Sequence, residues 1–546
     1  MKKNIMYTKY IWLLFILVGL TACNDVEDIL AENNAEIVID EPLPELTSGS
    51  ADFSNYVAVG ASFTAGFTDN ALFIASQQNS FPNTLANIFA NAGGGSFTQP
   101  WMSDNFGGLA AGGMRITDPR LVFDGSGPVG LESLIGPVTV GTDIVLNNPA
   151  GPFNNLGVPG AYSFHLIAPG YGSLANFPAA ANPYAIRLTG ATPNASILEL
   201  AIAQNPSFFT LSEFGGNDVL FYATSGGDGS RPITDTATFD FALTTMVDGL
   251  TANGAKGAIA NVPNITGLAH FTTVPYNPLD PSNPAFGPQI PTLNLIFGAL
   301  NQVFSAYGET DRLIVFSETE ASGVVIKDES LSDFSAQIAG ALAPNPAFAA
   351  LIGQFGLPPE AAPQVAGLLG FIYGQARQAT QNDMLVLPSS SVIGTVNYDS
   401  LAFLMSQGLS QALAGQFSVE GVSLPLEDKW VLLPTEQQEI AAATSAYNAS
   451  IASIASSKGL ALVDLDATLQ QAANSGIISG SFNLTTDLVL GGLISLDGVH
   501  LTARGYAVMA NKFLEAIDAT YGSNFVASGN TAQVGDFGVG YSPLLQ

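Results

Sequence analysis

Three short stretches of the chain hold side chains whose types could do chemistry together. They are residues 60–66 (GASFTAG, with Ser62), 215–218 (GGND, with Asn217) and 497–500 (DGVH). A serine hydroxyl becomes a good nucleophile only when a base takes its proton, and imidazole titrates close to neutral pH. Residues three apart on a tight turn can face the same way, so Asp497 could bond the ring of His500. An alcohol, an amide and an imidazole with a carboxylate therefore indicate nucleophilic chemistry, provided that the fold brings them together.

Each stretch alone also has an ordinary structural interpretation. Serine follows glycine in many turns, and Gly-Gly-Asn-Asp is a common turn sequence because these residues tolerate unusual backbone angles. An Asp-x-x-His sequence is often the capped start of a helix. The combination is informative because all three stretches lie at expected strand ends or helix starts.

The elements expected around these stretches alternate between strands and helices. Short apolar runs predict strands, and apolar residues at helical spacing predict helices. The strands are expected at 56–60, 208–214, 257–262 and 460–465, and the helices from 81 to a stop at Gly93, over 239–250, from a Thr435–Gln438 capping box to Gly459, and over 502–521. This order predicts an α/β fold with a mainly parallel sheet. Ligands of such sheets bind beyond the carboxyl ends of the strands, where the three stretches are expected.

Two regions give a weaker pattern. Residues 93–195 are rich in Gly, Pro and Asn, which favours loops with short elements. Residues 263–425 begin with a proline-dense loop and contain helical patterns near 292–307, 331–343 and 361–380, then a strand-like run at 384–387. Composition alone leaves open whether 263–425 is a second domain or a long insertion.

Composition excludes several classes of protein. The 546 residues include 45 Asp and Glu against 15 Lys and Arg, so nucleic acid is not an expected partner. An apolar content of 47% and a mean hydropathy of +0.30 exclude wholesale disorder. One cysteine, Cys23, allows no intrachain disulfide and no cysteine-based zinc site. The three histidines are far apart, so we expect no metal and no cofactor; His165 is expected to be a packed structural histidine and His270 to have no role.

The first 22 residues predict an export signal. Three lysines precede an apolar run over 11–20, and Leu-Thr-Ala-Cys follows, which favours a cleaved signal over a spanning helix. This sequence resembles the bacterial lipobox, which implies cleavage before Cys23 and lipid attachment there; a plain secretory signal is the alternative. Residues 24–54 hold nine acidic and no basic side chains, which predicts an extended tether over 23–54. We therefore expect an exported protein anchored by lipid to the bacterial outer membrane, and the acidic residues after Cys23 resemble surface-export signals of some lipoproteins.

The three stretches resemble the sequence blocks of the SGNH or GDSL-type serine hydrolases. The first block of that family reads G-D-S with a glycine four residues after the serine, and this chain departs from it only at Ala61. The G-x-N-D block is matched by 215–218 and the D-x-x-H block by 497–500. The remaining block is a single glycine, assigned to Gly160, with Gly157 and the glycines of 107–113 as competitors. The resemblance covers roughly 56–262 and 430–520.

The resemblance implies a three-layer α/β/α sandwich, flavodoxin-like in its sheet, with a large and mostly helical insertion. The hydrolase core would comprise 55–262 and 426–525, with 263–425 as the insertion, serving as a lid or substrate subdomain, and 526–546 as a C-terminal tail. Apolar stretches in the insertion could equally be ordinary helix cores.

The mechanism implied by the resemblance is acyl transfer. Ser62 would be the nucleophile, His500 the base, and Asp497 the group that orients the ring. The oxyanion hole would consist of the backbone amides of Ser62 and Gly160 and the side-chain amide of Asn217. The family aspartate has no chemical role in this mechanism, so alanine at position 61 affects only the turn around Ser62.

The expected function is that of a membrane-anchored serine ester hydrolase, lipase-like or esterase-like, that cleaves acyl esters through an acyl-serine intermediate. A lipid and an acetylated glycan both fit as the substrate. The alternative is a catalytically inactive surface lipoprotein of the same fold that binds a lipid or glycan ligand, which Ala61 and the long insertion would favour.

Overall fold

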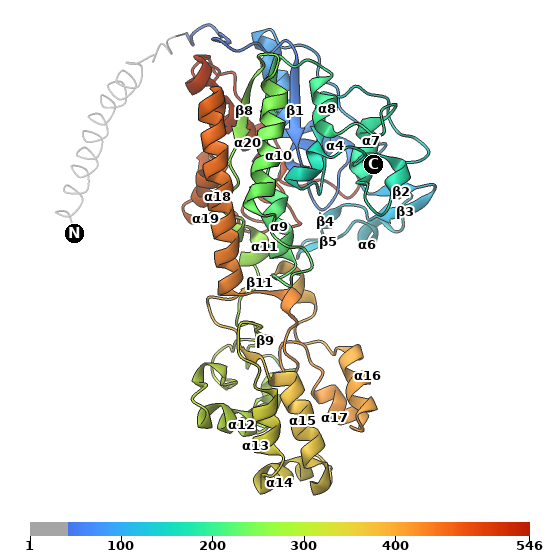
Figure 1. Ribbon diagram of the computed structural model, residues 1–546, viewed down its shortest axis with the longest axis vertical. Helices are drawn as coiled ribbons and strands as arrows, with labels where there is room; N and C mark the ends of the chain where they lie inside the picture. The colour runs from blue at the N-terminus through green and yellow to red at the C-terminus, as the bar shows by residue number, and fades with distance from the viewer. Residues whose placement is uncertain (1–41) are drawn as a thin grey trace, which may run out of the picture. The chain divides into compact units, whose positions relative to one another are not determined.

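The computed structural model describes residues 42–546 (Figure 1). Cys23, the expected signal at 1–22 and most of the expected tether lie outside the described residues. Of the described residues, 42–45 and 527–529 belong to a separate unit, and all that follows concerns the larger unit, 46–526 and 530–546. Within the described residues, no helix combines the length and apolarity needed to cross a membrane.

Five parallel strands form the central sheet. They are β1 (Tyr56–Gly60), β6 (Asn155–Gly157), β7 (Phe208–Leu211), β8 (Lys256–Ala260) and β13 (Ala461–Val463), in the spatial order β13-β8-β7-β1-β6. Counted along the chain this order is 2-1-3-4-5, a doubly wound order in which the chain changes direction between β1 and β7. The expected α/β class with a parallel sheet is confirmed, and the switch point lies where β1 and β7 end.

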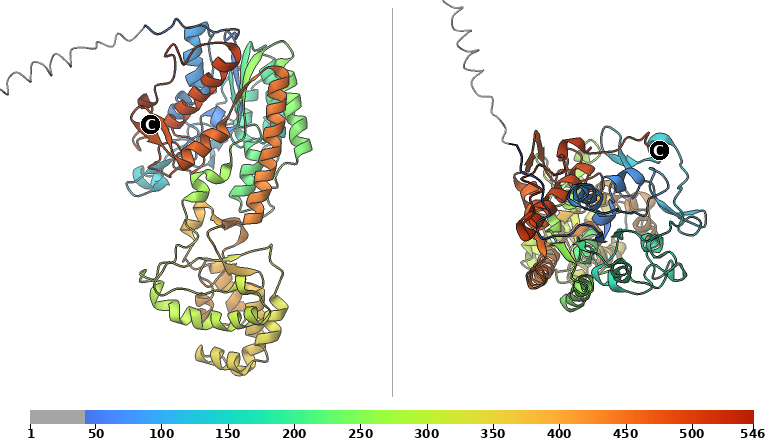
Figure 2. Two further views of the ribbon diagram at one scale, coloured as in Figure 1. Left: turned by 90° about the vertical axis from the view of Figure 1, so that its left-hand side faces the viewer. Right: turned by 90° about the horizontal axis from the view of Figure 1, so that it is seen from above.

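Helices pack against this sheet through large apolar side chains. The principal ones are α5 (Phe81–Phe89), α8 (Ile197–Ile202), α9 (Gly216–Thr224), α10 (Thr236–Thr251), α18 (Pro434–Lys458), α19 (Leu465–Asn474) and α20 (Ala503–Tyr521). Phe81 stacks on Phe513 with ring centroids 4.9 Å apart, which joins α5 to α20. Figure 2 shows the helices around the sheet from two further directions. Phe239 stacks on Tyr447 at 4.1 Å and joins α10 to α18. These contacts bury the strands in one apolar core.

The start of α18 differs from the expected capping box. The helix begins at Pro434, and the Glu436 carboxylate accepts the N–H of Leu433 at 2.6 Å. Thr435 and Gln438 are therefore not the cap, and that prediction is wrong. The physical reason is that proline, with a fixed φ and no N–H, suits the first helical position and starts the helix one residue earlier.

Residues 93–195 are loops with short elements, as expected, and one of these elements is the sheet strand β6. The other elements of this region are β2 (Leu109–Ala111), β3 (Met114–Thr117), β4 (Leu121–Phe123), β5 (Pro128–Gly130), α6 (Glu132–Ile135) and α7 (Pro183–Thr189). Short elements elsewhere in the larger unit are α3 (Ser62–Ala65), α4 (Ile74–Gln78), α11 (Ala269–Thr272), β14 (Ile477–Ser479) and β15 (Phe482–Leu484).

Parts of the expected tether and of the expected C-terminal tail pack against the core. Phe53, in the range expected for the tether, is buried and stacks on Phe89 at 4.0 Å. Tyr541, in the expected tail, packs edge-on against Phe73 at 4.8 Å.

A second apolar core lies within residues 274–433, between β8 and β13 in the sequence. Its elements are α12 (Ile290–Ala306), β9 (Val325–Lys327), α13 (Ser335–Leu342), α14 (Pro346–Gln354), α15 (Ala362–Tyr373), β10 (Ala376–Gln378), β11 (Met384–Leu385), α16 (Tyr398–Ser406), α17 (Gln411–Gln416) and β12 (Val431–Leu432). The helix expected over 361–380 ends at Tyr373, because residues 376–378 pair with β9 instead.

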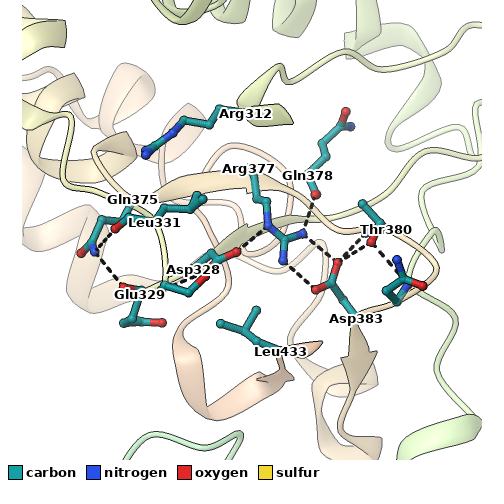
Figure 3. A network of polar contacts seen from close by, with 12 residues as sticks. Arg312, Asp328, Glu329, Leu331, Gln375, Arg377, Gln378, Thr380, Asp383 and Leu433 are labelled. Atoms are coloured by element: carbon teal, nitrogen blue, oxygen red, sulfur yellow. Dashed lines mark hydrogen bonds and ion pairs between the residues drawn. The ribbon is translucent and has the colours of Figure 1, made fainter. Parts of the chain in front are cut away.

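A buried ion pair holds this second core together (Figure 3). Arg377 donates to both carboxylate oxygens of Asp383 at 2.7 Å and to Asp328 at 2.6 Å. Both aspartates are buried. Because the two carboxylates bind one guanidinium through several bonds, this network fixes the β9–β10 pair relative to the chain that follows it.

Candidate active site

Ser62 lies at the carboxyl end of β1, as the first residue of the short helix α3, and is 7% exposed. A turn this tight needs glycine at position 60. A Cβ on Gly60 would lie 2.2 Å from the Thr64 Oγ1 and 2.6 Å from the Ser212 carbonyl oxygen. The Ser62 hydroxyl is 3.5 Å from an oxygen of Glu213, to which it donates its hydrogen bond. The serine is thus at the switch point between β1 and β7.

Glu213 places a buried carboxylate across the start of α3. It accepts the N–H of Ala61 at 3.2 Å, of Phe63, and of Thr64 at 3.0 Å, and the hydroxyls of Thr64 and Ser212 at 3.1 and 3.0 Å. Its φ is +55°, an uncommon value for a residue other than glycine. Burial raises the pKa of this carboxyl, against the opposing effect of its hydrogen bonds. The strand expected over 208–214 includes Glu213, and no sequence motif marks this residue as part of a site.

Asn217 and Asp218, in the first turn of α9, bind the loop that follows β6. The Asn217 side-chain amide donates to the Ala161 carbonyl at 2.8 Å. Asp218 accepts the N–H and the hydroxyl of Ser163 at 2.9 and 2.7 Å. Gly160, with a φ of +79°, lies next to the bonded carbonyl of Ala161. The loop of the expected oxyanion glycine is therefore attached to the helix that carries Asn217.

Gly157, Gly107 and Gly108, three of the competing glycines, have packing roles. A Cβ on Gly157 would lie 2.3 Å from the Ala65 backbone nitrogen, so this glycine lets β6 pack against α3. Gly107 and Gly108 face Ala71 and the Thr117 carbonyl in the same way, with a Cβ at 2.7 and 2.8 Å.

Asp497 and His500 form a hydrogen-bonded pair, with 3.0 Å between Oδ2 and Nδ1. Asp497 also accepts the N–H groups of Asn70 at 2.8 Å, Val499 at 2.9 Å and His500 at 2.8 Å. Burial acts to raise the pKa of Asp497, but the His500 ring and these donors hold it well below its usual range. The carboxylate is therefore ionised at neutral pH.

The His500 ring packs against the segment that Ser62 begins. Its centroid is 4.7 Å from that of Phe67 and 5.7 Å from that of Phe63. No hydrogen bond within 3.5 Å joins Ser62 to His500 in the described part of the chain. The Ser62 hydroxyl donates to Glu213 instead. The structure thus joins Asp497 to His500 and brings the ring beside α3, and it leaves the serine bonded to a different carboxylate.

An apolar pocket opens beside Ser62. Its cavity volume is about 90 Å³, and it is partly open to solvent. Ser62, Glu213 and Asn217 line part of it, and the rest is mainly aliphatic: Leu220, Pro263, Ile265, Leu268, Leu465, Leu469, Leu493, Ile494, Val499, Leu501, Val508 and Met509. The polar side chains of the site therefore adjoin a surface suited to a hydrocarbon group.

The other two histidines are packed in the protein. The His165 ring stacks on Tyr171 at 4.5 Å, and burial lowers its pKa to about 4. Burial also lowers the pKa of His270 to about 4, and the His270 backbone N–H donates to the Gly498 carbonyl at 2.9 Å. Within residues 42–546, no group of three His, Cys, Asp or Glu side chains is arranged to hold a metal ion.

Comparisons with known proteins find no significant match to a family model, a curated protein or a solved structure.

Proposed function

We propose that this chain is a serine ester hydrolase of the SGNH type. Ser62 attacks the ester carbonyl, His500 takes its proton, and Asp497 orients and stabilises the imidazolium. The observation that carries the proposal is the ionised Asp497 bonded to His500, whose ring packs on the segment that Ser62 begins.

The Asp497–His500 bond selects the ring nitrogen that would act as the base. An ionised carboxylate accepts a hydrogen bond, so Nδ1 carries the hydrogen and Nε2 keeps its lone pair. The Ser62 hydroxyl would turn away from its long 3.5 Å contact with Glu213 to donate to that nitrogen. Catalytic hydrogen bonds of this kind often tighten only when substrate is bound.

Unused N–H groups support an oxyanion hole. Across residues 42–546, neither the backbone N–H of Ser62 nor that of Gly160 donates a hydrogen bond. The Asn217 amide uses one of its two hydrogens on the Ala161 carbonyl and keeps the other. These are the donors expected for the oxygen that becomes negative when Ser62 adds to the carbonyl. The His500 imidazolium would then give its proton to the alcohol that leaves as the acyl-serine forms. Water, deprotonated by His500, would hydrolyse the acyl-serine, which releases the acid and restores the Ser62 hydroxyl.

The pocket favours an apolar acyl group over an acetylated glycan. A hydrocarbon chain would displace water from its aliphatic wall, whereas a sugar would leave its hydroxyl groups without partners there. A lipid ester also suits a protein anchored to the outer membrane through Cys23, which is part of this proposal.

A second candidate is a non-catalytic protein that binds an apolar ligand in the same pocket. The observation that favours it is the Ser62 hydroxyl, which bonds Glu213 rather than His500.

A series of p-nitrophenyl esters, from acetate to long acyl chains, separates the two candidates. We expect hydrolysis by the wild type and at least a thousandfold lower rate for Ser62→Ala, since the nucleophile is lost. Ser389→Ala, a buried serine of the second core, serves as the control and should keep its rate. Equal rates in wild type and Ser62→Ala would refute the hydrolase and leave the binding protein, which a fluorescent fatty acid would then detect.

A further inference from the structure

The helix that begins with Ser62 has no cap of its own. Ala61 occupies the N-cap position and has no side chain that could accept a hydrogen bond. An N-cap side chain normally accepts the N–H of the second or third helical residue. In α3 those residues are Phe63 and Thr64, and both donate to Glu213. The Glu213 carboxylate, just after β7, thus accepts the two hydrogen bonds that an N-cap side chain would accept.

The pattern of bonds around Glu213 is selective. Glu213 accepts the N–H groups of Ala61, Phe63 and Thr64, and the N–H of Ser62 has no acceptor among residues 42–546. The free N–H belongs to the one residue of the turn whose N–H the reaction needs. Since Ser62 lines the pocket, a rigid turn keeps both its N–H and its hydroxyl beside a bound ester.

The arrangement of Glu213 around the turn includes two locally unfavourable features. Glu213 has a left-handed φ of +55° and a buried carboxylate whose pKa is raised. Both features cost stability. Gly60 contributes the space, because a Cβ there would lie 3.1 Å from the Glu213 carboxylate oxygen.

We propose that Glu213 is a positioning residue for the nucleophile, which replaces a cap at position 61 and fixes the turn that presents Ser62. This inference rests on the proposed hydrolase function. It predicts that a carboxylate at position 61 can replace the one at position 213, because an N-cap aspartate would accept the same two N–H groups.

The test compares Glu213→Ala with the double variant Glu213→Ala/Ala61→Asp on the short-chain ester. We expect the single variant to lose about 10²-fold in kcat, the usual effect of a misplaced oxyanion donor, with KM changed less than threefold. The double variant should recover to within tenfold of the wild type. Ala61→Asp alone should be slower than the wild type, since two carboxylates would then compete for one set of donors.

Asp143→Ala is the matched control. Asp143 is also a buried carboxylate that accepts several N–H groups, those of Gly112, Gly113, Val145 and Leu146, but it does not line the pocket. This variant should lower the thermal midpoint and keep kcat.

The outcomes separate the two claims. An active wild type with Glu213→Ala at full kcat would overturn the positioning role alone. A double variant that folds but has a kcat no higher than that of Glu213→Ala would also overturn the positioning role alone. A wild type no faster than Ser62→Ala would overturn the proposed function and, with it, any role of Glu213 in the reaction.

Discussion

Asp69 is a buried acid, 2% exposed, beside the Asp497–His500 pair, and it gives the fold a pH dependence that can be measured. Its carboxylate accepts the Leu496 N–H at 3.1 Å, and its own N–H donates to the Ser495 hydroxyl at 3.1 Å. Burial, with a smaller contribution from the Asp497 charge, raises the pKa of Asp69 to about 7. Asp69 therefore links residues 495–496 to the segment after α3. Its carboxyl is buried, so its ionisation near neutral pH destabilises the fold.

The size and sign of the effect follow from that pKa. A pKa of about 7 against the ordinary value of 3.8 corresponds to roughly 4 kcal/mol between the folded and unfolded states. Because the pKa is higher in the folded state, this stability is fully present below about pH 4 and is lost as the pH rises to 7. Asn has the shape of Asp without its charge, and it tolerates the φ of +51° at this position. Asp69→Asn should therefore gain about 3 kcal/mol relative to the wild type between pH 4.5 and pH 8.

Thermal unfolding midpoints of the wild type and Asp69→Asn, measured at several values between pH 4.5 and pH 8, test this reasoning. The variant should gain steadily on the wild type as the pH rises. Asp143→Asn is the matched control with the opposite sign: burial acts to raise the pKa of Asp143, but four backbone N–H groups lower it overall. Its loss should be largest at neutral pH and shrink in acid. A gap for Asp69→Asn that stays constant with pH, or that favours the wild type at pH 8, would refute the argument.

Two further substitutions test the frame of the site and the second core. Gly60→Ala should destabilise the protein by about 1–3 kcal/mol and lower the rate of ester hydrolysis, because the new Cβ would lie 2.2 Å from the Thr64 Oγ1. A thermal midpoint and a rate equal to those of the wild type would contradict this prediction. Arg377→Met should destabilise the second core by about 3–5 kcal/mol, because it leaves the Asp328 and Asp383 carboxylates buried without their partner. Proteolysis within 274–433 should accelerate, and an unchanged rate of proteolysis would contradict the stabilising role of the ion pair.

Sequence patterns predicted the strands and helices that are determined by their own apolar spacing and capping residues. The apolar run ending at Gly60 is β1, and the periodic side chains of 239–250 lie in α10. Thr502 caps α20 at the expected place by accepting the N–H of Gly505. In contrast, β6 is only three residues long and lies in a stretch rich in Gly, Pro and Asn. Its pairing with β1, not its own composition, makes it a strand.

The same distinction applies to the site. Asp497 and His500 are three residues apart, so their bond could be expected from a tight turn. Glu213 lies 150 residues from Phe63 and acts through a bend at the end of β7. The pattern of 208–214 resembles a longer strand, and a left-handed residue within it depends on tertiary contacts. The structure shows Ala61 at an N-cap position without a capping side chain, and no sequence pattern linked it to Glu213.

The chain leaves the region of the sheet and returns to it at neighbouring points. Val274 bridges Leu385, and Leu385 pairs with Val431, so the departing and returning strands already lie side by side. The entropy of closing a loop grows only slowly with its length. The interval between these two points is therefore a natural place to graft a foreign module, such as a reporter domain, with little cost to the part of the molecule that contains the sheet.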